Sequence, residues 1–535
     1  MQLIKNATEE KLRGGFYTPN LIAAFMLRWA LNGHDDLDIL EPSCGDGVFL
    51  EEIRNGGYQY NSVKAIEFDE IEVEKARDIA LNNAEVIHDD FHNFCINTDQ
   101  RFDVVIGNPP YIRYQYFNKQ QQEYAAEIFG RANLRYSKLT NAWVSFVVGS
   151  SLILKENGKI GFVLPAEILQ VSYAQTLREF LAHYYNKINI ISFEKLVFPD
   201  IQQEVVLLLC EKNDTDTHLI EHLELRDADA LQNLDINLLE RPHKRIDFRS
   251  NKWTFYFLDQ EEIDFLEDLQ EEAIIPKLGE FAKVEVGITT GANPFFTVPL
   301  STVEQYNLEQ YARPLVGRSV QVPSAIFTEQ DWQLNRQMEA RTHLLAFPKM
   351  QDLNGSVGAR EYIAKGEEQE INKGYKCRIR EEWQIVPSLR VSDALFIRRN
   401  NIYPKLIINE AGAYTTDTMH RVTVLANAEI TALTASYYNS LSLAFAEICG
   451  RSHGGGVLEL MPNEVEEILL PYHANNAELL PEIDRLIRAR TDIREILEIT
   501  NQRILRDNFG FTEAQIKLAD SIWQKLSSRR LNRGK

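Results

Sequence analysis

The chain has 535 residues, 44% of them hydrophobic, and its 78 acidic and 57 basic residues give a formal net charge of −21. This length exceeds a single hydrophobic core, so we expect two or three domains. The sequence has no secretory signal or membrane-length apolar run, and its five cysteines lack the spacing of zinc ligands or of a disulfide framework. We therefore expect a cytoplasmic protein without membrane or metal sites. The acidic balance does not exclude DNA, because DNA binding depends on local basic clusters.

The first expected elements are a helix and then a strand that runs into a glycine-rich loop. Tyr17-Thr18-Pro19 opens the helix, with Thr18 as a suitable N-cap and Pro19 in the first turn. The apolar strand 38–41 leads into Pro42-Ser43-Cys44-Gly45-Asp46-Gly47 and a further helix. Glycines in such a loop let backbone N–H groups approach a ligand at a helix N-terminus. The loop lacks GxGxxG spacing, which disfavours a dinucleotide.

The next two strands are also followed by acidic residues. The strand 63–67 ends at Glu67, and a carboxylate at a strand tip can accept hydrogen bonds from both hydroxyls of a ribose. The alternative is a solvated glutamate at the end of a strand. A later strand, which begins at Val86, is followed by Asp89-Asp90-Phe91.

The apolar run 102–107 stops at Asn108-Pro109-Pro110-Tyr111, which indicates a buried strand that breaks into a rigid loop. The prolines fix φ and carry no N–H, so nearby carbonyls can accept hydrogen bonds from a ligand. Asn108 adds a neutral oxygen acceptor and Tyr111 a flat ring. Two acceptors beside a ring suit a planar group with an exocyclic NH2, such as adenine. The alternative is a strand-ending turn with a packed tyrosine.

Residues 112–138 interleave aromatic and basic side chains, a pattern that suits phosphates and unstacked bases. We interpret this segment as a cover over the site, and the alternative is a solvated surface loop. Strands and helices alternate as far as residue 210, which predicts a parallel sheet with helices on both faces. Ligands bind at the carboxyl ends of such strands, where the motifs above fall.

The pattern changes after about residue 225. The polar segment 227–251 is a suitable domain junction, and beyond it short strands and isolated helices follow without alternation. From Asn476 onward the apolar spacing predicts packing helices. The second half also carries glycine-containing segments, for most of which we favour an architectural role: 286–296, 314–319, 416–421 and 454–460.

These motifs resemble those of the TaqI-like group of N6-adenine DNA methyltransferases. The resemblance rests mainly on Asn108-Pro109-Pro110-Tyr111 and on the loop Glu41–Gly47, and it is looser in the second half. It implies an α/β fold with a Rossmann-like methyltransferase domain over 1–240 that uses S-adenosylmethionine (AdoMet). It further implies a mixed α+β target-recognition domain over 250–475, before a C-terminal helical segment over 476–535.

The resemblance also implies roles for individual residues, with Asp89 as a rival of Asp90 for contact with the adenine of the cofactor. The expected catalytic residues are Asn108, Pro109, Pro110, Tyr111 and Phe198. The expected AdoMet contacts are Tyr17, Thr18, Glu41, Pro42, Cys44, Gly45, Glu67, Asp90, Phe91 and Asn108. From their basic character and position we expect these DNA contacts: Arg113, Arg135, Lys138, Arg378, Arg380 and Arg390.

The expected reaction is transfer of the AdoMet methyl group to the exocyclic amine of an adenine flipped out of double-stranded DNA. The chain would be the monomeric modification enzyme of a restriction-modification system, with a separate cognate endonuclease as a candidate partner. The alternatives are a methyltransferase acting on RNA or protein glutamine, a methyltransferase fused to a nuclease, and a non-catalytic DNA-binding module. The sequence does not reveal the recognised DNA word.

Overall fold

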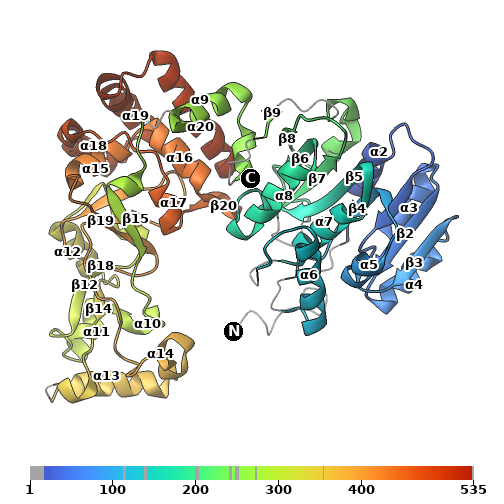
Figure 1. Cartoon of the computed structure of the whole chain (residues 1–535). Coiled ribbons are helices and arrows are strands. Elements are labelled where there is room, and N and C mark those ends of the chain that lie inside the picture. The colour runs from blue at the N-terminus through green and yellow to red at the C-terminus, as the bar shows by residue number, and fades with distance from the viewer. Residues whose placement is uncertain are drawn as a thin grey trace. The chain divides into compact units, whose positions relative to one another are not determined.

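The computed structural model describes residues 17–112, 116–137, 141–198, 204–239, 244–246, 252–271, 274–353 and 355–532. The chain forms two compact units, unit 1 within residues 1–263 and unit 2 over Asp264–Asn532 (Figure 1). Each unit has its own sheets and its own hydrophobic clusters. In the described part of the chain, no helix combines the length and the apolar character that a membrane crossing requires.

Unit 1 is built on a nine-stranded sheet with the order β3-β2-β1-β4-β5-β7-β6-β8-β9. Its strands are β1 (Asp38–Glu41), β2 (Ser62–Glu67), β3 (Ala84–His88), β4 (Phe102–Gly107), β5 (Leu154–Pro165), β6 (Lys187–Phe193), β7 (Val205–Glu211), β8 (Leu219–Leu225) and β9 (Lys244–Arg245). Neighbouring strands are parallel except that β7 is antiparallel to β5 and β6, and β9 to β8. The connection 194–204 between β6 and β7 is shorter than the dozen or so residues that a parallel crossover needs, so β7, like β9, departs from the expected parallel arrangement.

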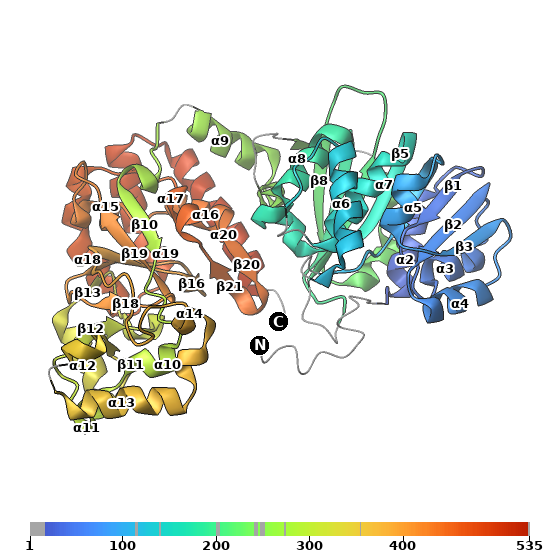
Figure 2. The ribbon, with the colours of Figure 1, turned by 60° about the horizontal axis from the view of Figure 1, so that its bottom comes forward.

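Helices cover both faces of this sheet, as Figure 2 shows. They are α2 (Asn20–Ala30), α3 (Val48–Gly56), α4 (Glu70–Asp78), α5 (Phe91–Asn97), α6 (Lys119–Arg131), α7 (Ala142–Leu152) and α8 (Gln175–Tyr184). Ile39 of β1 packs in one core with Phe25 of α2 and Phe49 of α3. The next residue along the strand, Leu40, points to the opposite face and is also fully buried. Burial on both sides explains why these strands are apolar runs.

Unit 2 contains three smaller sheets, with the orders β10-β19-β15-β17-β13, β11-β14-β12-β18 and β16-β21-β20. The strands are β10 (Ala282–Val286), β11 (Thr297–Val298), β12 (Ala312–Val316), β13 (Ile326–Phe327), β14 (His343–Leu345), β15 (Ala394–Ile397), β16 (Arg399–Asn400), β17 (Leu406–Asn409), β18 (Tyr414–Thr415), β19 (Met419–Val424), β20 (Arg451–His453) and β21 (Val457–Glu459). Most neighbouring pairs are antiparallel, as short strands joined without long crossovers require.

Helices complete unit 2 and dominate its C-terminal part, as the sequence predicts. They are α9 (Gln260–Glu271, which begins just before the unit), α10 (Asn293–Phe296), α11 (Leu300–Gln305), α12 (Glu329–Gln337), α13 (Val357–Glu368), α14 (Tyr375–Arg378), α15 (Ile430–Tyr437), α16 (Ser440–Cys449), α17 (Pro462–Glu466), α18 (Leu480–Arg488), α19 (Ile493–Asn501) and α20 (Glu513–Asn532). Apolar residues of the C-terminal helices, such as Ile483 and Ile496, are buried. The mixed α+β architecture and the C-terminal helices are therefore confirmed.

A buried ion pair joins α20 to α16. The guanidinium of Arg530, 2% exposed, donates from Nε and Nη2 to the two carboxylate oxygens of Glu447, at 2.9 and 2.6 Å. Its Nη1 donates to the backbone carbonyls of Asn401 and Gly456. The last turns of α20 are thus fixed to two loops and a helix by one side chain.

Replacing Arg530 by Met should lower the free energy of unfolding of unit 2 by about 3–5 kcal/mol, because Glu447 is then buried without its cation. Calorimetric unfolding of the full chain measures the loss. The double variant Arg530→Met/Glu447→Met is the matched control, since removing both charges should recover most of the stability. A double variant as unstable as the single one would contradict this account.

Candidate active site

The carboxyl ends of β1, β2, β3 and β4 share one edge of the unit 1 sheet, because these strands are parallel and form one block. Glu41 ends β1 and Glu67 ends β2, while Asp90 follows β3 and Asn108 follows β4. The fold thus brings four of the sequence-predicted residues to the edge where open α/β sheets bind ligands.

Glu67 holds the glycine loop against the end of β2. Its Oε2 accepts a hydrogen bond from the backbone N–H of Gly45 at 2.9 Å, and its Oε1 accepts from those of Phe68 and Asp69 at 2.8 and 2.9 Å. The same loop needs a glycine at Gly47, which has φ +91° and where an added Cβ would lie 2.4 Å from Ile79 Cδ1. The carboxylate of Glu67 is therefore not simply solvated at the end of the strand, because it accepts three backbone hydrogen bonds that hold the loop in place.

Glu41 is buried at the same edge with an unsatisfied oxygen. Its side chain is 2% exposed, and its Oε2 has no hydrogen-bond partner among the described residues. Burial, and then the charges of Glu67 and Asp46, raise the pKa of Glu41 well above its usual range. A buried acceptor without a donor is costly, so this oxygen is suited to a ligand that brings a cation or a hydrogen-bond donor.

Replacing Glu41 by Gln should raise the free energy of unfolding at pH 7 by about 1–3 kcal/mol, because it removes a carboxyl group whose ionisation is opposed by burial. Since folding raises the pKa of Glu41, the native state binds its proton more tightly than the unfolded chain, and the stability this group supplies is lost as pH rises above about 4.3. The gain of the variant should therefore disappear near pH 4. Thermal unfolding between pH 4 and 8 tests this, and a gain independent of pH would contradict it.

Asp90 lies in a buried hydrogen-bond network that the sequence did not reveal. Its Oδ1 accepts from the backbone N–H of His92 at 2.8 Å and lies 3.0 Å from His92 Nδ1, while His92 Nε2 lies 2.7 Å from Ser145 Oγ. Its Oδ2 accepts from Gln121 Nε2 at 3.0 Å. Burial alone would raise the pKa of Asp90, but the hydrogen bonds from His92 and Gln121 lower it. Ser145 and Gln121 come from α7 and α6, far along the chain, so no local pattern marks them.

The other predicted cofactor contacts have different environments. Tyr17 is exposed and its hydroxyl lies 3.4 Å from Glu72 Oε1, whereas Thr18 is buried. Thr18 is not the cap of α2, because that position is taken by Pro19 without a capping side chain. Phe91 is buried and stacks on Phe146, with ring centroids 4.8 Å apart.

Three polar contacts fix the loop that follows β4. The backbone carbonyl of Asn108 accepts a hydrogen bond from the hydroxyl of Ser43 at 3.1 Å, which links this loop to the glycine loop. The Tyr111 hydroxyl lies 2.9 Å from Asn108 Oδ1 and 3.1 Å from the carbonyl of Val163. Burial raises the pKa of Tyr111 well above its usual range, so its phenol is a neutral donor. Tyr111 and the buried Phe198 both pack against the hydrophobic core of unit 1.

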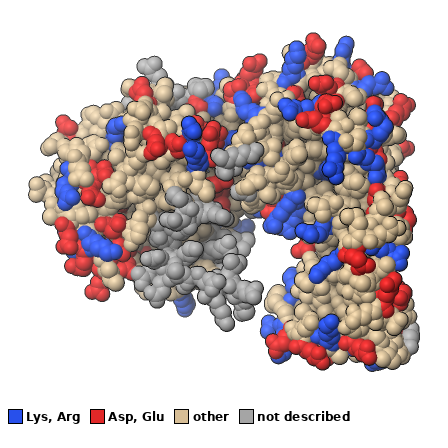
Figure 3. Space-filling view, turned by 180° about the vertical axis from the view of Figure 1, so that it is seen from behind, with Lys and Arg blue, Asp and Glu red and all other residues tan. Residues whose placement is uncertain are grey.

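The predicted DNA contacts are spread over both units, and they differ in whether their side chains pair with neighbouring groups. Arg113 and Lys138 lie outside the described residues, and Arg135 is exposed. Arg378 is exposed as well, whereas Arg380 and Arg390 are held by neighbouring groups. On the face drawn in Figure 3, basic and acidic side chains of the described residues are intermixed.

Glycine-containing segments of the second half meet around residues 415–420. The backbone N–H of Gly287 donates to the carbonyl of Met419 at 3.1 Å, and an added Cβ there would lie 1.9 Å from the carbonyl oxygen of Thr416. The Thr418 hydroxyl donates to the carbonyl of Gly317 at 3.0 Å. These contacts support the architectural interpretation of the glycines.

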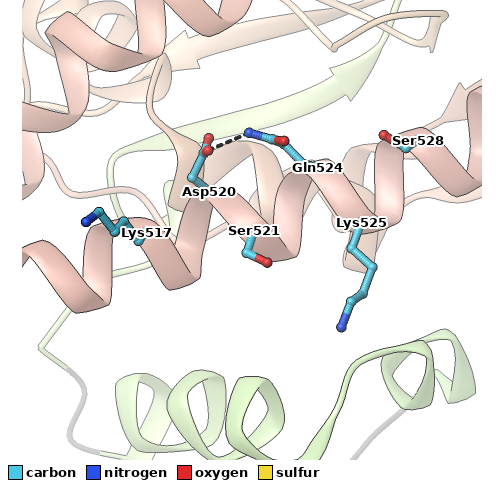
Figure 4. A pocket seen from close by; sticks show the side chains of 6 residues that line it. All are labelled: Lys517, Asp520, Ser521, Gln524, Lys525 and Ser528. Carbon is cyan, nitrogen blue, oxygen red and sulfur yellow. Dashed lines mark hydrogen bonds between the residues drawn. The ribbon is translucent and has the colours of Figure 1, made fainter.

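A polar hollow lies along α20 in unit 2, and Figure 4 shows its lining: Lys517, Asp520, Ser521, Gln524, Lys525 and Ser528. Asp520 accepts hydrogen bonds from Ser440 at 2.9 Å and from Gln524 at 2.6 Å. None of the sequence-predicted residues lines this hollow, so it is separate from the strand edge described above.

Residues 36–198 match the family described as "Eco57I restriction-modification methylase". Residues 250–505 match the family described as "Type II methyltransferase M.Eco57I, C-terminal domain". The two matches cover both units, and the first includes the whole edge from Glu41 to Asn108.

Individual relatives agree with these matches. The chain is 27% identical over 477 residues to Type II methyltransferase M.AccI of Acinetobacter calcoaceticus, which covers 84% of each chain. It is 28% identical over 198 residues to Type II methyltransferase M.HincII of Haemophilus influenzae, over 36% of each chain. Among solved structures, the Type IIL restriction-modification enzyme MmeI in complex with DNA aligns with a TM-score of 0.58 at 13% identity, over 92% of this chain and 73% of that one, which shows a shared fold.

Proposed function

Because this chain belongs to the restriction-modification methylases of the Eco57I type, we propose that it methylates the N6 amine of a specific adenine in double-stranded DNA, with AdoMet as the methyl donor. The observation that carries the proposal is the shared edge of β1 to β4, where Glu41, Glu67 and Asp90 stand beside the acceptor Asn108. In this proposal unit 1 performs catalysis, unit 2 recognises DNA, and a separate endonuclease cuts unmethylated sites.

The residues of the strand edge fit AdoMet. Glu41 has a buried oxygen without a donor and an elevated pKa, and AdoMet carries positive charge on its sulfonium and its ammonium group. A carboxylate offers about four acceptor positions, and backbone N–H groups fill three of those on Glu67, which leaves room for one ribose hydroxyl. Glu41 would therefore hold the cationic end and Glu67 the ribose.

AdoMet supplies a methyl group activated by its positive sulfur. The amine of adenine is a poor nucleophile, because its lone pair is delocalised into the ring. Asn108 Oδ1 and the Pro109 carbonyl would accept its two N–H groups and draw the nitrogen toward tetrahedral geometry, which localises the lone pair. Positioning and electrostatics then lower the barrier, so the proposed reaction uses no covalent nucleophile.

The contacts of Tyr111 suggest how the acceptor is kept ready. Its hydroxyl lies within hydrogen-bond distance of Asn108 Oδ1 and of the Val163 carbonyl. When the target amine donates a hydrogen bond to Asn108 Oδ1, the Tyr111 hydroxyl can donate to the Val163 carbonyl instead, so the hydroxyl keeps a hydrogen-bond acceptor. Flipping the adenine costs a few kcal/mol, and stacking on Tyr111 and Phe198, at about 1–3 kcal/mol per base, would offset much of it.

The direct test is methyl transfer from labelled AdoMet to unmethylated duplex DNA, RNA and a protein extract, followed by digestion of the DNA to nucleosides. We expect label in DNA alone, as N6-methyladenine at one sequence. Label in RNA, in protein glutamine or in cytosine would overturn the proposal. A second portion of the methylated DNA, sequenced for methylated adenines instead of digested, identifies the recognised word, because only one sequence context should carry the methyl group.

Asn108→Ala should reduce methyl transfer about a hundred- to a thousandfold, which is the effect of removing one hydrogen-bonding group from a charge-stabilising site, and should leave AdoMet affinity nearly unchanged. Single-turnover kinetics and AdoMet titration measure the two quantities separately. Asn55→Ala, an exposed position late in α3, is the matched control and should behave as wild type. Loss of AdoMet binding with normal transfer at saturation would remove Asn108 from the catalytic role.

Tyr111→Phe should keep most of the activity, because the ring that stacks on the base remains, whereas Tyr111→Ala should lose about ten- to a hundredfold. The loss in the Ala variant should be partly rescued by a target adenine opposite a mismatch, since that base is already easier to flip. Comparing both variants on paired and mismatched duplexes gives the readout. Equal losses on the two substrates would indicate a packing role for the tyrosine.

A further inference from the structure

The arginines predicted to contact DNA in unit 2 are not equivalent. The guanidinium of Arg380 donates to the carbonyls of Thr289 and Thr290, at 3.2 and 2.6 Å from Nη2, and to that of Trp383 at 3.2 Å from Nη1. It also lies over the ring of Phe296, 5.8 Å from the centroid. These contacts hold the loop after β10, so Arg380 is a structural anchor.

The side chain of Arg390 also interacts with neighbouring side chains, whereas that of Arg378 does not interact with any described residue. The Arg390 guanidinium forms an ion pair with Glu285 and lies 3.5 Å from the hydroxyl of Thr423. Arg378 is exposed, and its guanidinium makes no hydrogen bond or ion pair with any residue that the structure describes. The ammonium of Lys376, on the same short helix α14, is likewise exposed and unpaired within the described ranges.

The inner side of α14 is fixed tightly to the loop after β10. Cys377 is fully buried, with its Sγ 4.0 Å from the Thr290 carbonyl oxygen. Gly291 has φ +84°, and an added Cβ there would lie 2.8 Å from Lys376 Cβ. Arg380 closes the same contact from the C-terminal side. These contacts make α14 a rigid platform for its outer side chains, and Figure 1 shows the position of this helix in unit 2.

Large apolar side chains accompany the unpaired cations on the outside of α14. Tyr375 is 67% exposed and Ile379 is 62% exposed. Residues four apart lie on one side of a helical turn, so the ring of Tyr375 and the side chain of Ile379 are neighbours on the surface. We call the exposed side chains of Tyr375, Lys376, Arg378 and Ile379 the α14 face.

Three carboxylates close in sequence to the α14 face pair with groups outside it. Glu370 pairs with Lys373 at 2.6 Å, and Glu381 pairs with Lys349 at 3.4 Å. Glu382 accepts hydrogen bonds from the backbone N–H of Met350 at 2.8 Å and from Gln384 at 2.7 Å. The two free cations of the α14 face are left as local positive charge beside apolar surface, in a chain whose overall charge is negative.

We propose that the α14 face contacts double-stranded DNA, with Arg378 and Lys376 against phosphates or base edges and with Tyr375 and Ile379 against the sugars and bases between them. This inference rests on the proposed function and deepens it by naming the contacting side chains. Free cations beside an exposed ring and an aliphatic side chain match nucleic acid, which presents phosphates next to apolar base and sugar surface. A rigid platform also suits sequence reading, because it fixes where each side chain reaches.

The test measures binding of the full-length protein to a fluorescent duplex that contains its methylation site, at several salt concentrations. Arg378→Ala should weaken binding about tenfold. If Arg378 contacts a phosphate, the slope of log affinity against log salt should fall by about one, and if it contacts a base, the methylated sequence should relax at one position. Tyr375→Ala should weaken binding with an unchanged slope, because it removes no charge. Arg503→Ala, an exposed arginine outside α14, is the matched control and should match wild type.

The outcomes separate this inference from the proposed function. If wild type methylates duplex DNA but Arg378→Ala and Tyr375→Ala keep wild-type affinity, salt slope and site choice, the α14 face is not a DNA contact and the proposed function stands. An equal loss in Arg503→Ala would also overturn the inference, because the effect would then come from overall charge. If wild type neither binds nor methylates duplex DNA, the proposed function itself fails. Thermal midpoints equal to wild type would show that the exposed substitutions leave the fold intact.

Discussion

The carboxylate of Glu67 is the interaction on which the candidate site depends. It accepts a backbone N–H from Gly45 in the loop after β1 and two more from the residues that follow β2. The Ser43 hydroxyl then joins the same loop to the backbone of Asn108 after β4. Three strand ends are thereby tied together through hydrogen bonds to backbone atoms. The position of the proposed catalytic acceptor therefore depends on the loop proposed to bind the cofactor.

The carboxylates of the site differ in whether their oxygens have hydrogen-bond donors. Asp90 is fixed by His92 and Gln121, which lowers its pKa, whereas Glu41 is buried with an oxygen that no described residue supplies with a donor. Natural proteins keep such costly groups mainly where function needs them. The buried, unsatisfied oxygen of Glu41 thus lowers the stability of this edge of the sheet, and a positively charged ligand bound there would reduce that cost.

In unit 2, arginines with the same charge serve different purposes because their surroundings differ. Arg530 is buried and anchors α20 through Glu447, and Arg380 anchors a loop through backbone carbonyls. Arg390 is neutralised by Glu285 at the surface. Arg378 differs from these arginines in its environment alone. Its guanidinium is exposed and pairs with no residue that the structure describes, so it remains available to a binding partner. Position within the fold, rather than residue type, decides which cation can bind.

The sequence by itself determined the order of the strands and loops in unit 1 and the motifs at their ends. Local chemistry is enough for this, since buried parallel strands are apolar runs and their loops need glycine, proline and capping acids. It also predicted the mixed second half and the packing helices at the C-terminus. The motif Asn108-Pro109-Pro110-Tyr111 lies after β4, at the edge of the sheet that the alternation of strands and helices predicts for a ligand.

Only the tertiary structure decided which side chains meet across long stretches of chain. Ser145 approaches His92 and Val163 approaches Tyr111 because separate elements pack together, and neither partner stands out in a local pattern. The antiparallel return of β7 and the anchoring of Arg380 were likewise decided by connection length and by packing. Periodicity and motif spacing describe neighbours along the chain, whereas hydrogen-bond partners and exposed faces are set by neighbours in space.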